Sequence, residues 1–230
     1  MIIKPIPELE QIPKLKSKTL PGIRLYQLPN ERWVPSVTSV LGWRKRDFFR
    51  EWRCKVGPQV AQEGAKRGQH MHDLVEAKLE GKDTSKVEAQ NPLAGIVGKK
   101  LFKTIEPALE AVEILHVLEQ PLYSEVMTLA GRCDAVVTAD GHLEVWDFKT
   151  AKEPKPEKWL LDYYLQVTAY ILMIQEITGL DIQRGRVIVS CENGKVQVKK
   201  IHYKDYENTL AEEILGYYAD LQERLKNGKQ

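Results

Sequence analysis

A predicted β-hairpin carries the residues of this sequence that are best suited to chemistry. Its signal is the dipeptide Asp140-Gly141 between two apolar runs, which is among the strongest short-range indications of a two-residue hairpin loop. We therefore predict antiparallel strands over residues 132–138 and 143–149. Because the turn is so short, it also sets the register in which the two strands pair.

In this register Asp134 lies directly across from Asp147, with both carboxylates on one face. Facing like charges are destabilising unless a cation lies between them. Lys149 points to the same face because strand side chains alternate. Mg²⁺ takes oxygen ligands, commonly one or two carboxylates and a substrate phosphate. We predict that both aspartates and Lys149 are catalytic, that the aspartates and the backbone carbonyl of Phe148 bind the metal, and that Lys149 positions water or stabilises developing charge.

Two expected helices carry further candidates. One ends at Gly81, which suits a C-terminal cap, and begins at residues 66–72, so that it includes His72. A lone histidine on a helix is seldom a metal ligand, and His72 becomes a candidate only together with the two aspartates. The other helix follows the hairpin, and on it Gln166 and Tyr170 share a face because they are four residues apart.

The N-terminal part offers groups for binding a polyanion. Ser36 and Thr38 suit either the cap of a helix or hydroxyl contacts to phosphate. Residues 45–66 show an amphipathic helical pattern, interrupted at Pro58. Its basic face consists of Arg44, Lys45, Arg46, Arg50, Arg53 and Lys55. A solvated surface explains such a charge run equally well, but the interleaved aromatic residues favour a channel for a single nucleic-acid strand.

The order of the expected elements predicts the α/β (α+β) class, with a central mixed β-sheet flanked by helices. We expect residues 1–22 to be an extended N-terminal arm and residues 23–230 to form a single domain. Within that domain a helical part, which would guide the substrate, covers residues 36–112 and the sheet core covers residues 113–202. An amphipathic helix over residues 205–226 ends the domain.

Bulk composition excludes little. Lys and Arg number 34 against 32 Asp and Glu, for a net charge of +2, so affinity for nucleic acid must come from a local basic patch. The cysteines, Cys54, Cys133 and Cys191, show no CxxC spacing, which argues against a structural zinc or iron–sulfur site and fits a reducing compartment. Without a secretory or membrane-spanning segment, we expect a cytoplasmic protein, or a viral protein acting in the host cytoplasm.

Four short motifs follow one another along the chain: Gly68-x-x-x-His72, Gly131-x-x-Asp134, Asp147-x-Lys149-Thr150 and Gln166-x-x-x-Tyr170. This series resembles the ordered signature of the RecB-like branch of the PD-(D/E)XK nucleases. Further segments are similar to those of mitochondrial genome maintenance exonucleases and related phage exonucleases: Pro35-Ser36-Val37-Thr38, Pro154-Lys155-Pro156 and Leu165-Gln166-Val167-Thr168-Ala169-Tyr170. The resemblance covers about residues 26–176.

The resemblance implies a restriction-endonuclease-like core with an N-terminal helical region, and Mg²⁺ or Mn²⁺ as the cofactor. It implies that His72, Asp134, Asp147 and the Phe148 carbonyl bind metal, that Lys149 is the catalytic lysine, and that Gln166 and Tyr170 support the site and contact the DNA backbone. We expect Ser36 and Thr38 to be further substrate contacts, as the alternative to the helix cap. Spacing from Gly68 favours His72 over His70, and Glu119 lies where related proteins often carry a glutamate. The cysteines that build an iron–sulfur cluster in some relatives have no counterpart, so we expect no cluster.

We therefore expect a divalent-metal-dependent DNA exonuclease that acts on single strands or on DNA ends during replication, repair or recombination. A structure-selective endonuclease, of the flap or single-strand type, would use the same site. A nuclease fold that has lost activity and only binds nucleic acid is the third interpretation, against which the complete set of Asp134, Asp147 and Lys149 argues. In each case the partner is nucleic acid, without a role for a membrane.

Overall fold

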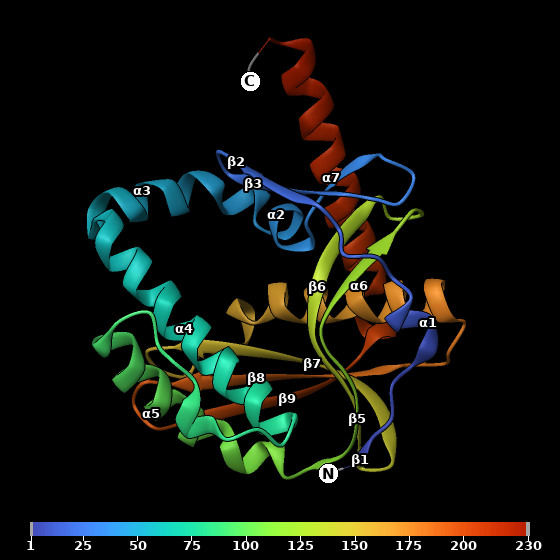
Figure 1. Cartoon of the computed structure of the whole chain (residues 1–230). Coiled ribbons are helices and arrows are strands. Elements are labelled where there is room, and N and C mark those ends of the chain that lie inside the picture. The colour runs from blue at the N-terminus through green and yellow to red at the C-terminus, as the bar shows by residue number, and fades with distance from the viewer. Residues whose placement is uncertain (1, 229–230) are drawn as a thin grey trace.

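The predicted hairpin lies in the middle of a six-stranded sheet with the order β1-β5-β6-β7-β8-β9 (Figure 1). The structure, a computed structural model, describes residues 2–228, with the side chains at positions 49, 52, 53 and 58 outside that description. The strands are β1 (Ile2–Ile3), β5 (Val112–Ser124), β6 (Leu129–Ala139), β7 (His142–Ala151), β8 (Arg184–Cys191) and β9 (Val196–His202). The pairs β1–β5 and β7–β8 are parallel and the other neighbours are antiparallel, so the sheet is mixed, as predicted.

The register of the hairpin is the predicted one. Pairing between β6 and β7 runs from the turn to Ala135, which lies opposite Trp146. Both turn residues have left-handed backbones, with φ of 51° at Asp140 and 72° at Gly141, as the type I′ turn of a two-residue hairpin requires. Asp134 and Asp147 are the next residues beyond the last pair, at the end of the hairpin away from its turn.

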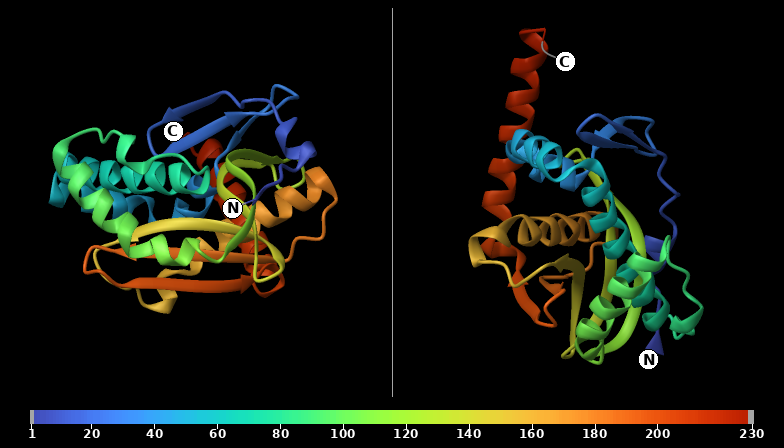
Figure 2. Two further views of the ribbon diagram at one scale, coloured as in Figure 1. Left: turned by 60° about the horizontal axis from the view of Figure 1, so that its bottom comes forward. Right: turned by 90° about the vertical axis from the view of Figure 1, so that its left-hand side faces the viewer.

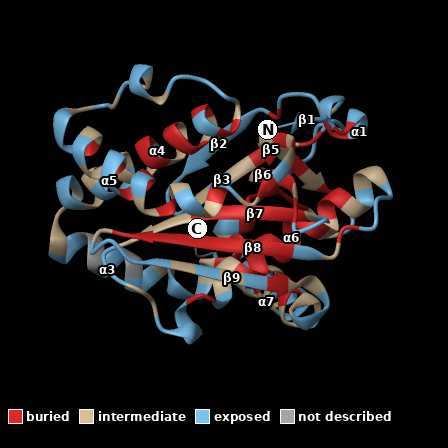
Figure 3. Cartoon of the chain, turned by 90° about the horizontal axis from the view of Figure 1, so that it is seen from below, coloured by how far each residue is buried: buried red, intermediate tan, exposed pale blue. Residues whose placement is uncertain are grey.

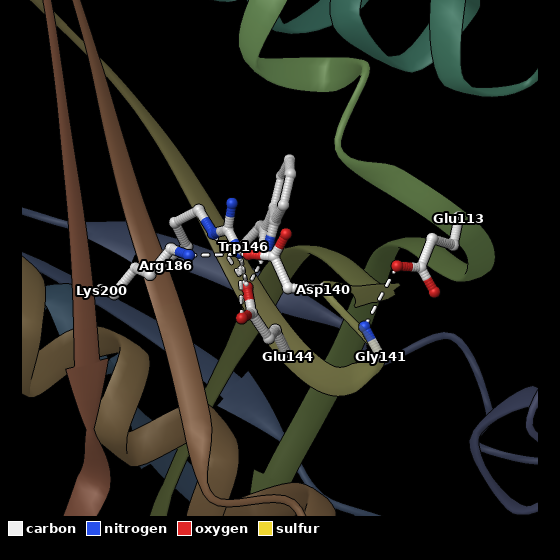
Figure 4. A network of polar contacts seen from close by, with 7 residues as sticks. All are labelled: Glu113, Asp140, Gly141, Glu144, Trp146, Arg186 and Lys200. Carbon is white, nitrogen blue, oxygen red and sulfur yellow. Dashed lines mark hydrogen bonds and ion pairs between the residues drawn. The ribbon is translucent and has the colours of Figure 1, made fainter.

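A polar network ties the turn end of the hairpin to the next two strands (Figure 4). Arg186 on β8 donates from Nε and Nη2 to the two oxygens of Glu144, at 2.9 and 3.0 Å, and Nη2 also donates to Asp140 at 3.0 Å. Trp146 Nε1 donates to Glu144 at 2.6 Å, and Lys200 on β9 donates to Asp140 at 2.7 Å. Arg186 and Glu144 are buried, so we expect the loss of either partner alone to be costly.

Helices cover both faces of the sheet (Figure 3). On one face α6 (Leu161–Thr178) packs against Val145 of β7 and Val187 of β8. On the other face α4 (Pro58–Leu79) and α5 (Pro92–Leu109) pack against Trp146 and Phe148 of β7. Successive residues of β7 thus point into opposite cores, which fixes the side of the sheet that each residue faces.

The helix boundaries follow the sequence signals with two differences. The first basic helix, α3 (Arg46–Val56), ends before Gly57, whose φ is 84°. Pro58 is the first residue of α4, so this helix starts there and not near residue 66 as predicted, because proline suits the first turn. Asn91 caps α5, and where the sequence predicts a helix that breaks at Pro107, the structure places Pro107 within the last turn.

The expectation of an extended arm over residues 1–22 does not hold. This segment contributes β1 to the central sheet, and α1 (Pro7–Glu10) buries Leu9 completely. A smaller sheet follows, formed by β2 (Ser17–Leu20), β3 (Ile23–Gln27) and β4 (Trp33–Pro35). The sequence did not reveal β1 because its partner β5 lies more than 100 residues further along the chain, whereas β2 pairs with the adjacent β3 and was missed in a segment rich in proline and lysine.

The remaining helices complete the frame. The short α2 (Val37–Leu41) follows β4, and α7 (Glu207–Lys226) packs its first turns against the α6 side of the core, whereas its last turns project from the body (Figure 2). Short 3₁₀ helices lie at Trp43–Lys45, Thr84–Lys86, Glu157–Trp159 and Tyr203–Asp205. Within residues 2–228, none of the helices combines the length and apolar character that a membrane span needs.

Candidate active site

Three neighbouring strands bring three carboxylates side by side at the end of the hairpin away from its turn. Glu119 on β5 lies across from Asp134 on β6, since the residues on either side of each are paired. On the other side of Asp134, β6 and β7 are paired as far as Ala135 and Trp146, and Asp147 is the next residue of β7; its carboxyl lies close enough to Asp134 for that group to raise its pKa. Asp134 is therefore the middle member of the row.

The backbone pairing of β6 with β7 has ended where these carboxylates lie. At this point the N–H of Phe148 donates to Oδ2 of Asp134 at 2.7 Å, so the aspartate side chain takes the place of a backbone acceptor. The ring of Phe148 is buried and lies edge-on to the His72 ring, with 6.3 Å between centroids. The structure thus shows Phe148 positioning Asp134 and His72, while the metal-binding role of its carbonyl stays a prediction.

His72, on helix α4, approaches these carboxylates from the helical layer that packs against the sheet. Its Nδ1 lies 3.7 Å from Oδ2 of Asp134 and 4.0 Å from Oε1 of Glu119. One ligand atom from each of the three residues lies within 4.8 Å of the others. Imidazole nitrogen and carboxylate oxygen are both common ligands of divalent metals. The structure therefore groups Glu119, which the sequence placed only loosely, with His72 and Asp134.

Asp147 and Lys149 form a buried pair beside this group. Lys149 Nζ lies 2.5 Å from Oδ2 of Asp147, whose side chain is fully buried. The other oxygen of Asp147 has no hydrogen-bond partner within the described part of the chain. Burial, with a contribution from Asp134, raises the pKa of Asp147 to about 6 even though Lys149 opposes the shift.

Lys149 stays a cation in this setting. Burial acts to lower the pKa of Lys149, but the carboxylates of Asp147 and Asp134 outweigh it and raise that pKa above its ordinary value. A buried carboxylate with an unsatisfied oxygen costs free energy unless a cation or a donor approaches it. The residues present therefore fit a divalent metal next to Asp147.

Glu119 has an unusual backbone as well as an unusual pKa. Its φ is 49°, a left-handed conformation that is uncommon for a residue other than glycine and concentrates at functional sites. Oε2 of Glu119 pairs with Nε of Arg132 at 2.7 Å. Burial first, and Asp134 second, raise the pKa of Glu119 to about 7 against the effect of Arg132. We infer that the site holds Glu119 in place and disfavours its ionisation until a cation binds.

The supporting residues explain the spacing of the motifs. A Cβ at Gly131 would lie 2.7 Å from Cε1 of Tyr170, so glycine is needed for the tyrosine ring of α6 to pack against β6. Gln166 Nε2 donates to the Tyr170 hydroxyl at 3.2 Å, and both side chains are buried. Gly68 lies close to Thr150, because a Cβ there would be in van der Waals contact with Oγ1 of that residue at 3.4 Å. Tyr170 and Gln166 thus fix the strand that carries Asp134, and their contact with substrate stays a prediction.

The two histidines occupy different environments. His70 is 2% exposed, and its ring lies close to Gly98 of α5, where a Cβ would approach to 2.7 Å. Neither ring nitrogen of His70 has a hydrogen-bond partner among the described residues. His70 is therefore a core residue, and His72 is the histidine that faces the carboxylates.

Ser36 caps α2 as one of the two sequence interpretations predicted. Its hydroxyl accepts from the Ser39 N–H at 3.1 Å and lies 3.1 Å from Oγ1 of Thr38. Ser36 and Thr38 line a cavity of about 320 Å³ that also includes His72 and Asp134. The cap is thus observed, and the phosphate contact of these hydroxyls stays a prediction.

The predicted basic face around α3 is partly neutralised. Arg44 pairs with Glu213 at 3.2 Å, Lys45 with Asp162 at 2.6 Å, and Arg50 with a neighbouring aspartate of its own helix at 3.1 Å. The side chains at positions 49, 52 and 53, which the sequence assigned to this basic and aromatic helix, lie outside the described part of the structure. Two other cations, Arg24 and Arg132, line the cavity that contains His72 and Asp134. Neither of them was identified as a candidate from the sequence.

Comparison with known proteins gives consistent matches. A family model described as the PD-(D/E)XK nuclease superfamily matches residues 44–230. Mitochondrial genome maintenance exonuclease 1 of Homo sapiens is 26% identical over 204 residues, which cover 82% of this chain and 57% of the relative. The Mus musculus protein of the same name is 24% identical over 189 residues, covering 81% and 51%. The chain thus spans about half the length of these curated relatives.

Among solved structures, a protein of Eubacterium rectale that is provisionally described as an exonuclease aligns with a TM-score of 0.46. The sequences are 13% identical, and the alignment covers 71% of this chain and 69% of the other.

Proposed function

Because this chain belongs to the PD-(D/E)XK nuclease superfamily, we propose that it is a divalent-metal-dependent deoxyribonuclease that degrades single-stranded DNA or DNA ends as an exonuclease. The observation that carries the proposal is the convergence of His72, Glu119 and Asp134 beside the buried pair of Asp147 and Lys149. The exonuclease names of the curated relatives support the exonucleolytic mode.

The metal would be held by His72, Glu119 and Asp134, with Asp147 next to them. This set of one imidazole and several carboxylates suits Mg²⁺ or Mn²⁺ better than a soft metal. When bound, such a cation lowers the pKa of a coordinated water and neutralises charge on the phosphate. It would also relieve the repulsion among the facing carboxylates and satisfy the free oxygen of Asp147.

The protein's own groups then divide the remaining work. Lys149, kept protonated by Asp147 and Asp134, would orient the attacking water or donate to the phosphate oxygen on which negative charge develops. Asp134 is held by the Phe148 N–H and Glu119 by Arg132, so these oxygens are oriented before the substrate arrives. Preorganised groups of this kind need little rearrangement during the reaction.

A single strand would reach the carboxylates along the cavity that Ser36 and Thr38 line. Arg24 and Arg132 line the same cavity and would contact phosphates. The overall charge of +2 gives no general attraction, so these local cations would have to supply it.

The test is cleavage of end-labelled linear single-stranded DNA, of duplex DNA and of circular single-stranded DNA, each with Mg²⁺, with Mn²⁺ and with EDTA. We expect metal-dependent loss of linear strands, intact circles, and no activity for Lys149→Ala. Lys100→Ala, at an exposed lysine of α5, is the matched control and should keep wild-type activity. Cut circles would replace the exonuclease by an endonuclease, and uncut DNA in every condition would leave only binding.

We further propose that the activity serves DNA replication, repair or recombination, where single strands and ends are removed. The widely spaced cysteines fit a reducing compartment, so we propose that it acts in the cytoplasm, of its own cell or of the host of a virus. Co-localisation of a tagged protein with newly made or damaged DNA would test this placement.

A further inference from the structure

A second cleft opens next to the candidate active site. Its volume is about 1090 Å³, and it shares Gly64 of α4 and Thr150 of β7 with the active-site cavity. Its walls are the first turns of α4, the loop of residues 151–156, and Trp159, which is 61% exposed. Thr150 follows Lys149 directly in the sequence, so the cleft adjoins the strand segment that carries the catalytic lysine.

Lys155 is fixed on the wall of this cleft by its backbone. Its N–H donates to Oε1 of Gln197 on β9 at 2.7 Å, and Nε2 of Gln197 donates back to the carbonyl of Lys155 at 2.9 Å. Pro154 and Pro156 flank it, and each ring restricts the backbone on its side. The position of Lys155 therefore depends little on its own side chain.

The side chain of Lys155 contacts the same aromatic ring as the catalytic lysine. Its ammonium donates to the hydroxyl of Tyr163 and lies 4.7 Å from the centroid of that ring. Nζ of Lys149 lies 5.4 Å from the same centroid. Since both distances end at one point, the two ammoniums are at most about 10 Å apart. One nucleic-acid strand can contact both.

The two lysines differ in their counter-ions. Lys149 is paired with Asp147, and Arg67, which lines the same cleft, is paired with Glu192 at 3.3 Å. Among the described residues Lys155 has no carboxylate partner, and its hydrogen-bond acceptor is the hydroxyl of Tyr163. A preorganised cation without a counter-ion, in an open cleft, suits a bound anion.

We propose that Lys155 binds a phosphate of the substrate strand next to the scissile phosphate, and that Trp159 stacks on the base of a nucleotide in this cleft. The inference rests on the proposed function and adds a substrate subsite to it. Stacking on an exposed indole tolerates every base, which suits an enzyme that must move along a strand of any sequence.

The first experiment measures binding of a fluorescent single-stranded oligonucleotide in EDTA, where no cleavage occurs, over a series of salt concentrations. Lys155→Gln is expected to raise the Kd about tenfold and to reduce the slope of log Kd against log salt by about 0.7, the effect of one lost phosphate contact on a single strand. Lys158→Gln, at an exposed lysine of the neighbouring 3₁₀ helix that does not line the cleft, is the matched control and should change neither quantity.

For Trp159, replacement by alanine is expected to raise the Kd about tenfold for every base composition, and Trp159→Phe should recover most of that loss. An unchanged Kd in Trp159→Ala removes the stacking role. Because the side chain is 61% exposed, neither change should impair folding, which circular dichroism checks.

Oligonucleotides with a single neutral methylphosphonate locate the contact. One position should weaken binding by the wild type and should cost Lys155→Gln nothing more, since the same contact is already lost. If Lys155 only positions Tyr163 and Lys149, Lys155→Gln will lower kcat and leave the Kd and its salt slope at wild-type values, which would overturn the inference. Absence of cleavage by the wild type under every metal condition contradicts the proposed function itself.

Discussion

Removing the metal should make this protein less stable at pH 8 than at pH 5. The reason is that Asp147 and Glu119 titrate at a higher pH in the folded chain than in the unfolded chain, from 3.8 to about 6 and from 4.5 to about 7. For each carboxyl group, at pH values between its unfolded and its folded pKa, the folded chain binds more protons than the unfolded chain. The free energy of unfolding therefore falls as the pH rises through this window.

The size of the effect follows from the two shifts. One pKa unit corresponds to about 1.4 kcal/mol. Between pH 5 and pH 8 the free energy of unfolding should fall by about 3 kcal/mol through Glu119, whose pKa of about 7 lies about two units above pH 5, and by about 1.4 kcal/mol through Asp147, whose pKa of about 6 lies about one unit above it. Asp147 and Glu119 share the neighbour Asp134, so the two contributions are not additive and the total should lie below the sum. For a chain of this size 3 kcal/mol corresponds to roughly 6–12 °C in Tm.

The assay is urea unfolding in EDTA at closely spaced pH values from 5 to 8, for the wild type, Asp147→Asn and Glu119→Gln. Each variant should lose part of the pH dependence, whereas Glu88→Gln, at an exposed carboxylate, should keep it. His70, whose pKa burial lowers from 6.5, acts in the opposite sense and costs stability as the pH falls below that value. Comparing each variant with the wild type at the same pH cancels its contribution.

Excess Mg²⁺ should restore stability mainly at pH 8, because it binds the ionised carboxylates of the folded chain. A metal-free wild type whose stability relative to both variants does not change with pH would refute the electrostatic account. Equal stabilisation by Mg²⁺ at pH 5 and pH 8 would contradict the ligand assignment.

The other predictions concern single residues. Asp134→Asn should abolish metal-dependent cleavage while DNA binding survives, and calorimetric titration with Mn²⁺ should show weakened affinity; wild-type affinity would exclude Asp134 as a ligand. Gly131→Ala should destabilise the fold by about 1–3 kcal/mol and lower activity, because its Cβ would lie 2.7 Å from the Tyr170 ring; an unchanged Tm and kcat would show that the ring can move away. Arg186→Met should cost about 3–5 kcal/mol, since Glu144 is left buried without its partner, and adding Glu144→Leu should recover much of it; chemical denaturation measures both, and additive losses would contradict the pairing.

The hairpin was predictable because its signal is local. Two turn residues determine the register over many positions, so the sequence correctly predicts the pairing up to Ala135 and Trp146, beyond which Asp134 and Asp147 are the next residues. The motif residue Gly131 was equally visible, although only the structure shows that the Tyr170 ring requires it.

Glu119 could not be placed in this way. The pairing of β5 with β6 contains two register shifts, and Glu119 itself has φ of 49°. No turn signal in the sequence records such irregularities, so counting residues along β5 does not show which side chain faces Asp134. The same holds for Tyr163, which reaches Lys149 only because α6 packs against β7.

The polar network around the turn of the hairpin bears on how many molecules in a preparation are active. A slip of one residue between β6 and β7 would turn Asp134 to the other face of the sheet, and a slip of two would keep the face but separate Asp134 from Asp147. Either misregistered form would be compact but would lack catalytic activity. Asp140 accepts hydrogen bonds from Arg186 and Lys200, and so connects the turn to β8 and β9, which follow much later in the sequence. Weakening these contacts should therefore lower the fraction of competent molecules found by active-site titration, while each competent molecule keeps its full turnover rate.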